Sequence, residues 1–259
     1  MSSSDLRSFL DKLADAASAE ILPHFRTAFA VENKGTNGFD PVTVADRAAE
    51  TAIRKLIQAT YPDHGIVGEE FPAERAGAEN VWVIDPIDGT RAFIAGIPVW
   101  GSLIGLLSKG APTLGMMVQP FTGERFGGDG KSAWYTGPAG PGTLKTRACP
   151  KLGDAILSTT TPFLFDDIEM PAYRRVEAAA RMARYGCDCY AYAMLAAGFI
   201  DVVIEAGLKP YDIVALIPVI EGAGGKVTTW DGGSAASGGR VVATGDPRLH
   251  EIVLKMLRV

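Results

Sequence analysis

Val81-Trp82-Val83-Ile84-Asp85-Pro86-Ile87-Asp88-Gly89-Thr90 is an apolar run that ends abruptly in two carboxylates, a glycine and a hydroxyl. The apolar half predicts a buried strand. Pro86 cannot donate to a sheet ladder and Gly89 permits unusual backbone angles, so we expect the chain to leave the sheet at Asp85. Asp85 and Asp88 would then share a small space, where two carboxylates repel each other without a cation. Because hard oxygen ligands suit Mg²⁺, the stretch predicts a divalent-cation site.

A simple turn is the alternative for this stretch, since Asp, Pro and Gly are the ordinary turn residues. A second acidic segment, Gly68-Glu69-Glu70, follows another short apolar run at 65–67. Two strand ends that both carry acids favour an acidic cluster over a turn.

Composition excludes several classes of protein. The chain has 259 residues, enough for one large domain or two closely packed lobes. Its 47% hydrophobic and 21% charged residues are typical of a globular protein. A net charge of −5 without any Lys/Arg-rich run argues against nucleic-acid binding. Since neither a signal-like start nor an 18-residue apolar run occurs, we expect no membrane partner and a cytoplasmic location.

The first half of the chain reads as two helices followed by an antiparallel sheet. The predicted elements are helices over 6–21 and 44–57 and strands over 65–67, 81–84, 100–107, 111–119, 125–127 and 133–135. A glycine-rich loop, Lys34–Gly38, separates the helices. Gly127–Ser132 ends like a nucleotide phosphate loop, but Arg125 stands where that motif needs glycine, so we interpret the segment as a hairpin tip.

Gly-Pro-Ala-Gly-Pro-Gly at 137–142 predicts a lobe boundary. We therefore expect an N-terminal α+β metal-binding lobe over 1–142 and a C-terminal α/β substrate-specificity lobe over 143–259. In the second lobe we predict strands over 155–160, 201–205, 226–230 and 241–244 and helices over 172–183, 190–197, 213–223 and 249–257. Such alternation favours a layered α/β arrangement.

Three acidic segments in this order resemble the inositol-monophosphatase-like family of Mg²⁺-dependent, lithium-sensitive phosphatases. They are Gly68-Glu69-Glu70, Asp85–Thr90, and Tyr211-Asp212 followed by Glu221–Gly225. The resemblance covers nearly the whole chain, although the family usually has Trp-Asp where this chain has Tyr211-Asp212. It implies alternating layers of helices and sheets in two closely packed lobes, as in inositol monophosphatases and fructose bisphosphatases. It also implies a small-molecule phosphate monoester as substrate, two or three Mg²⁺ ions per active site and a homodimer.

The resemblance implies a role for each matching metal ligand. Asp85 would bridge two Mg²⁺ ions. Glu69 and the backbone carbonyl of Ile87 would complete the ion on the nucleophile side. Asp88 and Asp212 would hold the ion on the leaving-group side. Considered alone, Asp212 could equally cap the apolar helix that follows it.

Further residues would act on water and phosphate. Thr43 and Asp46 match a Thr-x-x-Asp element of the family, so Asp46 and Thr90 would orient the attacking water. From its position alone, Asp46 could simply interact favourably with a helix dipole. Gly89 and Thr90 begin a segment whose backbone N–H groups could cradle phosphate oxygens. Glu70 would be a weaker, water-mediated participant.

The substrate should be decided by Arg184-Tyr185-Gly186-Cys187-Asp188-Cys189-Tyr190. It resembles the Arg-x-Gly-Gly-Asp-Cys-Tyr signature of the family's histidinol-phosphate phosphatases, with Cys187 in place of the second glycine. Asp188 and Glu205 would receive the cationic end of histidinol. Asp188 could instead cap a helix and Glu205 could pair with Lys209. Arg184 would contact a carboxylate or the phosphate, in its own or a neighbouring subunit.

The leading function is therefore hydrolysis of L-histidinol phosphate to L-histidinol and phosphate by metal-activated water, a step of histidine biosynthesis. A close alternative is an inositol-1-phosphate or broad sugar-phosphate phosphatase. A third, from another class, is a metal-dependent binding module without catalysis.

Overall fold

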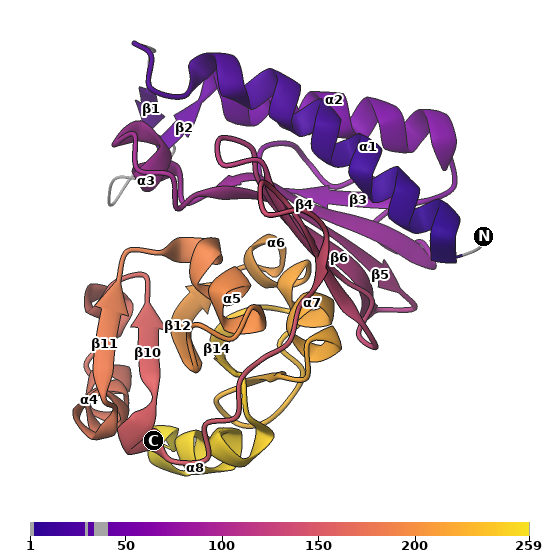
Figure 1. The fold of residues 1–259 in the computed structure, drawn as a ribbon. Coiled ribbons are helices and arrows are strands. Elements are labelled where there is room, and N and C mark those ends of the chain that lie inside the picture. Colours follow the sequence, from indigo (N-terminus) through magenta and orange to yellow (C-terminus); the bar gives the residue numbers. More distant parts are fainter. Residues whose placement is uncertain (1–2, 29–30, 34–40, 259) are drawn as a thin grey trace.

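Two β-sheets, with a layer of helices between them and one on each outer side, make up the fold in a computed structural model (Figure 1). The structure describes residues 3–28, 31–33 and 41–258. Helices α1 (Ser3–Ile21) and α2 (Val44–Thr60) cover the outer face of a seven-stranded sheet. The order of layers is thus helix, sheet, helix, sheet, helix, which confirms the predicted layered α/β fold.

The seven-stranded sheet follows the order of the sequence. Its strands are β3 (Gly65–Gly68), β4 (Asn80–Asp88), β5 (Gly101–Ser108), β6 (Ala111–Gln119), β7 (Glu124–Gly128), β8 (Ala133–Thr136) and β9 (Gly142–Thr143). Only β3 and β4 are parallel; every later pair is antiparallel, as the predicted hairpins require. β1 (Val31–Asn33) and β2 (Pro41–Thr43) form a separate two-stranded sheet. The predicted glycine-rich loop at 34–38 lies outside the described residues.

The two N-terminal helices owe their position to apolar residues at helical spacing. Leu10, Leu13 and Ile53 are fully buried and pack with Trp82 and Ile84 of β4. Pro23 lies in the 3₁₀ helix Leu22–His24, so α1 ends before it, as predicted. No helix in the described part of the chain is long and apolar enough to cross a membrane.

The second sheet has the strand order β11-β10-β12-β14-β13. Its strands are β10 (Ile156–Thr159), β11 (Met182–Tyr185), β12 (Val202–Leu208), β13 (Lys226–Thr229) and β14 (Gly239–Thr244). The helices of this half are α4 (Glu169–Ala179), α5 (Asp188–Ala196), α6 (Pro210–Ile213), α7 (Leu216–Gly222) and α8 (Pro247–Leu257), with short 3₁₀ turns at Leu152–Asp154 and Pro162–Leu164. Helices α4 and α8 cover the outer face (Figure 1). The division of roles between lobes at residue 142 stays a prediction.

Two predicted helices of the second half differ from the structure. The helix expected over 172–183 ends at Ala179, and Met182–Tyr185 is an edge strand parallel to β10. Met182, Arg184 and Tyr185 are exposed, so this strand shows no alternation of apolar and polar residues that could reveal it. The helix expected over 213–223 is broken at Val214 and Ala215 into α6 and α7. Pro218 has no N–H for the carbonyl of Val214, which an unbroken helix would need to pair.

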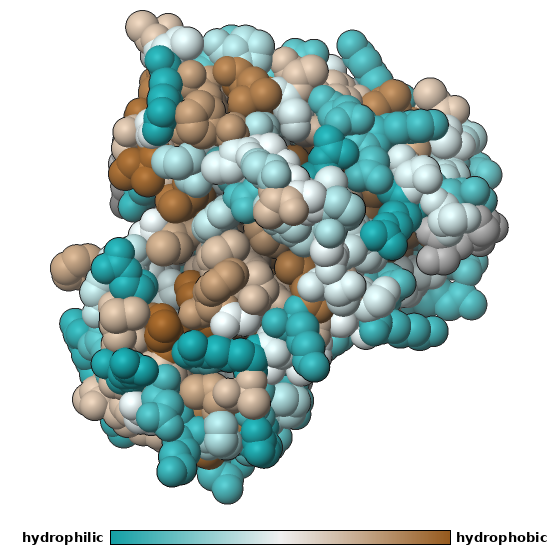
Figure 2. All heavy atoms as spheres, viewed as in Figure 1, coloured by the Kyte–Doolittle hydropathy of each residue, from teal (hydrophilic) through white to brown (hydrophobic). Residues whose placement is uncertain are grey.

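The break between α6 and α7 is also where the two halves meet most closely. A Cβ added to Gly115 of β6 would lie 1.9 Å from the carbonyl oxygen of Ala215. One added to Gly105 of β5 would lie 2.8 Å from the Ala215 nitrogen. These glycines let the start of α7 rest directly on the seven-stranded sheet, and Val214 packs there against Val81 and Val83. In the space-filling view the outline is indented on its left side, between the two halves and below α3 (Thr90–Ile94) (Figure 2).

Candidate active site

The end of β4 delivers Asp85 and Asp88 through a bulge. The predicted exit from the sheet at Asp85 is wrong, because β4 continues to Asp88. Asp85 lies opposite Leu103 of β5 and Asp88 opposite Gly101, so β4 holds one more residue here than its partner. The extra residue accommodates Pro86, whose carbonyl accepts a 2.7 Å hydrogen bond from Ser102 Oγ. Residues three apart in a regular strand face opposite sides, but the bulge turns both carboxylates to the side facing α6.

Two other segments bring acids to the same place. β3 runs parallel to β4, with Gly68 beside Ile84, so Glu69 follows the strand next to Asp85 and its carboxyl comes within hydrogen-bonding reach of that residue. Asp212 comes from α6, where its Oδ2 accepts a 2.7 Å hydrogen bond from the Lys209 N–H. The capping alternative is wrong in its original form, because the N-cap residue of α6 is Lys209 and Asp212 lies inside this short helix, from where it bonds back to the cap. One carboxylate oxygen from each of Asp85, Asp88 and Asp212 lies within 4.8 Å of the others.

The cluster holds more negative charge than its surroundings can stabilise. Burial, with Glu69, Asp88 and Asp212 nearby, raises the pKa of Asp85 well above its usual value. Burial and the charges of Asp188 and Asp212 do the same to the pKa of Asp88. The pKa of Asp212 is raised to about 7, mainly by burial. A divalent cation would relieve this repulsion and displace the protons, and a donor set made only of oxygens fits Mg²⁺.

Asp46 lies at the start of α2 and is 1% exposed. Its Oδ2 accepts hydrogen bonds from the Thr43 N–H at 2.8 Å and from Thr43 Oγ1 at 2.5 Å, which completes a capping box. Burial raises the pKa of Asp46 to about 6, and the charge of Glu69 adds to the effect. The helix-start interpretation is therefore correct, and the role of Asp46 toward the attacking water stays a prediction.

Gly89 and Thr90 form the turn that follows the acids. Gly89 has a φ of +83°, which favours glycine, and a Cβ there would lie 3.2 Å from Asp188 Oδ2. Thr90 begins the short helix α3, and its Oγ1 donates a 3.0 Å hydrogen bond to the carbonyl of Ile87. This bond fixes the direction of the Ile87 carbonyl, which follows the buried Asp85 by two residues.

Asp188 and Glu205 lie beside this cluster, on the second half of the molecule. The Cys189 N–H donates a 2.6 Å hydrogen bond to Asp88 Oδ2, which docks the start of α5 on the end of β4. Asp188 is the first residue of α5, has a φ of +42° and does not cap the helix, because the N-cap residue is Cys187. Burial raises the pKa of Asp188, and Thr160 and Arg91 partly oppose the shift. The capping alternative for Asp188 is therefore wrong.

Glu205 is 2% exposed and belongs to β12. Its carboxylate accepts hydrogen bonds from the Thr160 N–H at 2.6 Å and from Thr159 Oγ1 at 3.2 Å, and no ion pair joins it to Lys209 in the described residues. Burial raises the pKa of Glu205 to about 8, with a contribution from Asp188. The predicted pairing with Lys209 is wrong because the end of β10 already occupies this carboxylate.

Unlike Asp188 and Glu205, Arg184 has no contact with the acidic cluster among the described residues. It is exposed on the edge strand β11, where its charge partly offsets the burial that raises the pKa of the Cys187 thiol. Among the residues that the structure describes, it has no hydrogen-bond or ion-pair partner. Cys149, Cys187 and Cys189 are free thiols.

Sequence reasoning missed three buried polar residues near the site. Tyr192 of α5 is buried, its hydroxyl has no hydrogen-bond partner in the described part of the chain, and Glu205, Asp88 and Asp212 are among the charges acting on it. An aromatic residue in an apolar helix gives no signal of such a role. Glu50 and Arg54 of α2 lie on the buried side of that helix. Glu50 follows Asp46 by four residues and Arg54 follows Glu50 by four, a spacing that could have indicated a shared polar stripe.

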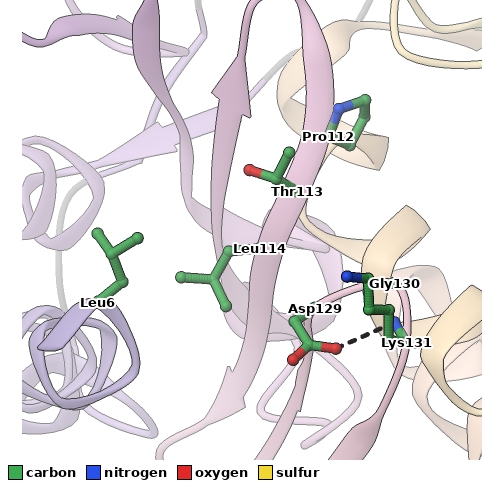
Figure 3. Close-up of a pocket in the computed structure, with 7 residues that line it drawn as sticks. All are labelled: Leu6, Pro112, Thr113, Leu114, Asp129, Gly130 and Lys131. Atoms are coloured by element: carbon green, nitrogen blue, oxygen red, sulfur yellow. Dashed lines mark hydrogen bonds between the residues drawn. The ribbon is translucent and has the colours of Figure 1, made fainter. Parts of the chain in front are cut away.

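A separate surface hollow of about 550 Å³ lies between α1, β6 and the β7–β8 turn (Figure 3). Among the described residues that line it, Asp129 alone carries a carboxylate, and it accepts hydrogen bonds from the backbone N–H groups of Lys131 and Ser132 at 3.0 and 2.7 Å. The segment is a hairpin tip, as predicted, and its acid is already paired. This hollow therefore does not compete with the acidic cluster as a catalytic site.

Comparison with known proteins gives consistent results. Residues 3–258 match the model of the inositol monophosphatase family. The chain is 46% identical over 257 residues to the bifunctional phosphatase IMPL2 of the Arabidopsis thaliana chloroplast, covering 95% of this chain and 72% of that one. It is 35% identical over 225 residues to a histidinol-phosphatase of Mycobacterium tuberculosis, covering 84% of each. A solved structure of an inositol monophosphatase from Zymomonas mobilis matches with a TM-score of 0.89 and 38% identity, over the whole of both chains.

Proposed function

The chain belongs to the inositol monophosphatase family, and on that premise we propose that it is a Mg²⁺-dependent phosphatase whose substrate is L-histidinol phosphate. Membership in this family supports the general activity, which is metal-dependent hydrolysis of a small phosphate ester. The substrate is supported by one observation above all, the half-buried Asp188 and the buried Glu205 beside the acidic cluster.

The acids of the cluster would hold the metal. We assign Asp85 as the shared ligand, Glu69 and the Ile87 carbonyl to one ion, and Asp88 and Asp212 to the other. When bound, Mg²⁺ supplies an activated water and neutralises charge on the departing alkoxide. The number of ions, two or three, stays part of the proposal.

Residues at the edge of the cluster would act on the attacking water and the phosphate. Asp46, with a pKa of about 6, is largely ionised at neutral pH and can accept a hydrogen bond from water. Thr90 Oγ1 already donates to the Ile87 carbonyl, so its lone pairs remain able to accept a hydrogen bond from the same water. The backbone N–H groups of Gly89 and Thr90 would bind phosphate oxygens.

The raised pKa values of Asp188 and Glu205 favour a cation as their partner. Neutral ligands would leave Asp188 and Glu205 protonated or uncompensated, whereas an ammonium or imidazolium group supplies the missing positive charge. The name of the mycobacterial relative, histidinol-phosphatase, agrees with this choice. Arg184 stays a candidate contact for the substrate. The homodimer and the cytoplasmic location stay predictions.

An inositol phosphate is the second candidate, because the structural relative from Zymomonas mobilis is an inositol monophosphatase. The half-buried Thr160, which follows β10, could face a neutral polyol. A binding module without catalysis is disfavoured, because residues 3–258 match the model of a family of phosphatases.

An assay of phosphate release distinguishes these three proposed functions. The purified chain is assayed with histidinol phosphate, inositol 1-phosphate and a neutral sugar phosphate, with Mg²⁺ and after removal of metal by EDTA. We expect Mg²⁺-dependent turnover with the highest kcat/KM on histidinol phosphate, and inhibition by millimolar Li⁺. Equal kcat/KM on all three esters would indicate a broad phosphatase, and no turnover with metal would indicate a binding module.

A further inference from the structure

We propose that Glu50 and Arg54, a buried ion pair on α2, are positioning residues that hold the Glu69 segment against the acidic cluster. The inference rests on the proposed function in one respect only, that Glu69 is a metal ligand. Neither residue touches the cluster itself, so their effect would pass through the backbone of residues 68–74.

The pair contacts this segment at three points. Glu50 is 0% exposed, and its Oε2 accepts a 2.8 Å hydrogen bond from the Glu70 N–H. Its Oε1 accepts a 2.8 Å hydrogen bond from Arg54 Nε. The other two nitrogens of Arg54 donate to the Phe71 carbonyl at 3.1 Å and to Glu74 Oε1 at 3.0 Å. A single buried pair thus binds two backbone groups and one side chain of the same loop.

Glu69 lies between two residues whose backbones contact the Glu50 carboxylate. On one side of it is Gly68, where an added Cβ would lie 2.0 Å from Glu50 Oε1, so only glycine lets the backbone pass so close to the carboxylate. On the other side is Glu70, whose N–H is bonded to the same carboxylate. The Glu69 N–H itself donates to the Ile84 carbonyl of β4 at 3.2 Å. The backbone of Glu69 is therefore fixed on both sides, with its carboxyl directed to Asp85.

The same helix also carries Asp46. Residues 46, 50 and 54 are spaced by four and share one face of α2. Asp46 lies close enough to Glu69 for its pKa to respond to that charge. One helical face therefore sets the position of two acids that come from distant parts of the sequence.

Stability alone does not account for this pair. A buried ion pair is often no more stabilising than apolar residues of the same volume, because both charges lose their hydration. Apolar residues at 50 and 54 could fill the space, but they could not bind the Glu70 N–H and the Phe71 carbonyl. The two charged groups therefore fix the position of the loop that carries Glu69. Groups that orient a metal ligand typically raise the affinity for the metal.

The test uses the full-length protein freed of metal. Titration calorimetry measures Mg²⁺ binding to the parent and to Glu50→Gln, whose amide can still accept from the Glu70 N–H but lacks the charge that orients Arg54. We expect Mg²⁺ affinity to fall about 10- to 100-fold. The concentration of Mg²⁺ that half-saturates activity should rise in parallel, while KM at saturating Mg²⁺ stays the same.

Asp201→Asn is the matched control. Asp201 is also 0% exposed, and it accepts hydrogen bonds from one arginine, Arg147, and from the Ile156 N–H at 2.7 Å. It immediately precedes β12, four residues before Glu205, and is not one of the acids assigned to the metal. This variant should lose thermal stability to a similar degree and keep its Mg²⁺ affinity.

Each outcome decides between the alternatives. Unchanged Mg²⁺ affinity in folded Glu50→Gln would overturn the inference, as would an equal loss in Asp201→Asn. If Glu50→Gln does not fold, Arg54→Lys serves instead, since lysine keeps the charge but not the fork that reaches Phe71 and Glu74. Because binding is measured directly, a parent that binds Mg²⁺ but hydrolyses no ester would refute the proposed function and leave this inference standing.

Discussion

Replacing Glu205 by glutamine should weaken the hydrolysis of histidinol phosphate by an amount that grows with pH. The carboxylate of Glu205 is 2% exposed and accepts from Thr159 and Thr160, contacts that an amide oxygen can retain in part. Its pKa of about 8 means that the free enzyme holds a proton there at neutral pH. A cationic substrate must first cause that proton to leave.

The magnitude follows from two opposing contributions. A hydrogen bond to a charged group contributes about 1.5–3 kcal/mol. Ionising a group of pKa about 8 costs about 2 kcal/mol at pH 6.5 but only about 0.2 kcal/mol at pH 8.5. The loss of kcat/KM in Glu205→Gln should therefore be below about fivefold at pH 6.5 and about 10- to 100-fold at pH 8.5.

Steady-state kinetics of parent and variant at both pH values, on histidinol phosphate and on a neutral sugar phosphate, measure this effect. The neutral ester controls for titration of the phosphate and of the acidic cluster. On this ester, the kcat/KM of the parent divided by that of the variant should stay near one at both pH values. A loss that is equal at both pH values, or equal on both esters, would refute the role of Glu205 as the partner of a cation.

Three further predictions concern the metal, the turn and the stability. Asp85→Asn should abolish turnover and leave the metal-free protein folded, because one of several mutually repelling charges is removed; activity near that of the parent would refute the bridging role. Gly89→Ala should lower both thermal stability and kcat, because φ is +83° and the new Cβ would press on Asp188, whereas Gly110→Ala, with φ +79° and open space, should lower stability alone. Without metal, the stability of the parent relative to Glu205→Gln should fall as the pH rises from about 5 to 8, because an acid whose pKa is raised by folding stabilises the protein only while it is protonated. Urea unfolding at several pH values measures this difference in stability. A difference that does not change with pH would contradict the prediction.

Local sequence was sufficient to predict two strands that carry acids near their ends, although β4 continues past the predicted exit to Asp88. Val81–Ile84 and Gly65–Val67 are apolar runs that stop at acids, and a run of that kind specifies both a buried strand and what it carries. The hairpin around Lys109 and Gly110 was predictable for the same reason, because turn residues interrupt two apolar runs.

The features that sequence did not reveal depend on partners far along the chain. Pro86 stays within β4 only because Ser102 of β5 bonds its carbonyl across a bulge. Tyr192 is distinguished from a core residue by the acids of other segments around it. Glu50 acquires its role from the backbone of Glu70, which is 20 residues away. Such contacts leave no local pattern.

Competition between two esters in one reaction tests the central claim most directly. Histidinol phosphate and inositol 1-phosphate are mixed at equal concentration with the enzyme and Mg²⁺, and phosphorus NMR follows the disappearance of each. Because both compete for the same enzyme, the ratio of their rates equals the ratio of their kcat/KM values. A pocket built around Asp188 and Glu205 predicts that histidinol phosphate is consumed first, and equal consumption or a preference for inositol 1-phosphate would contradict it.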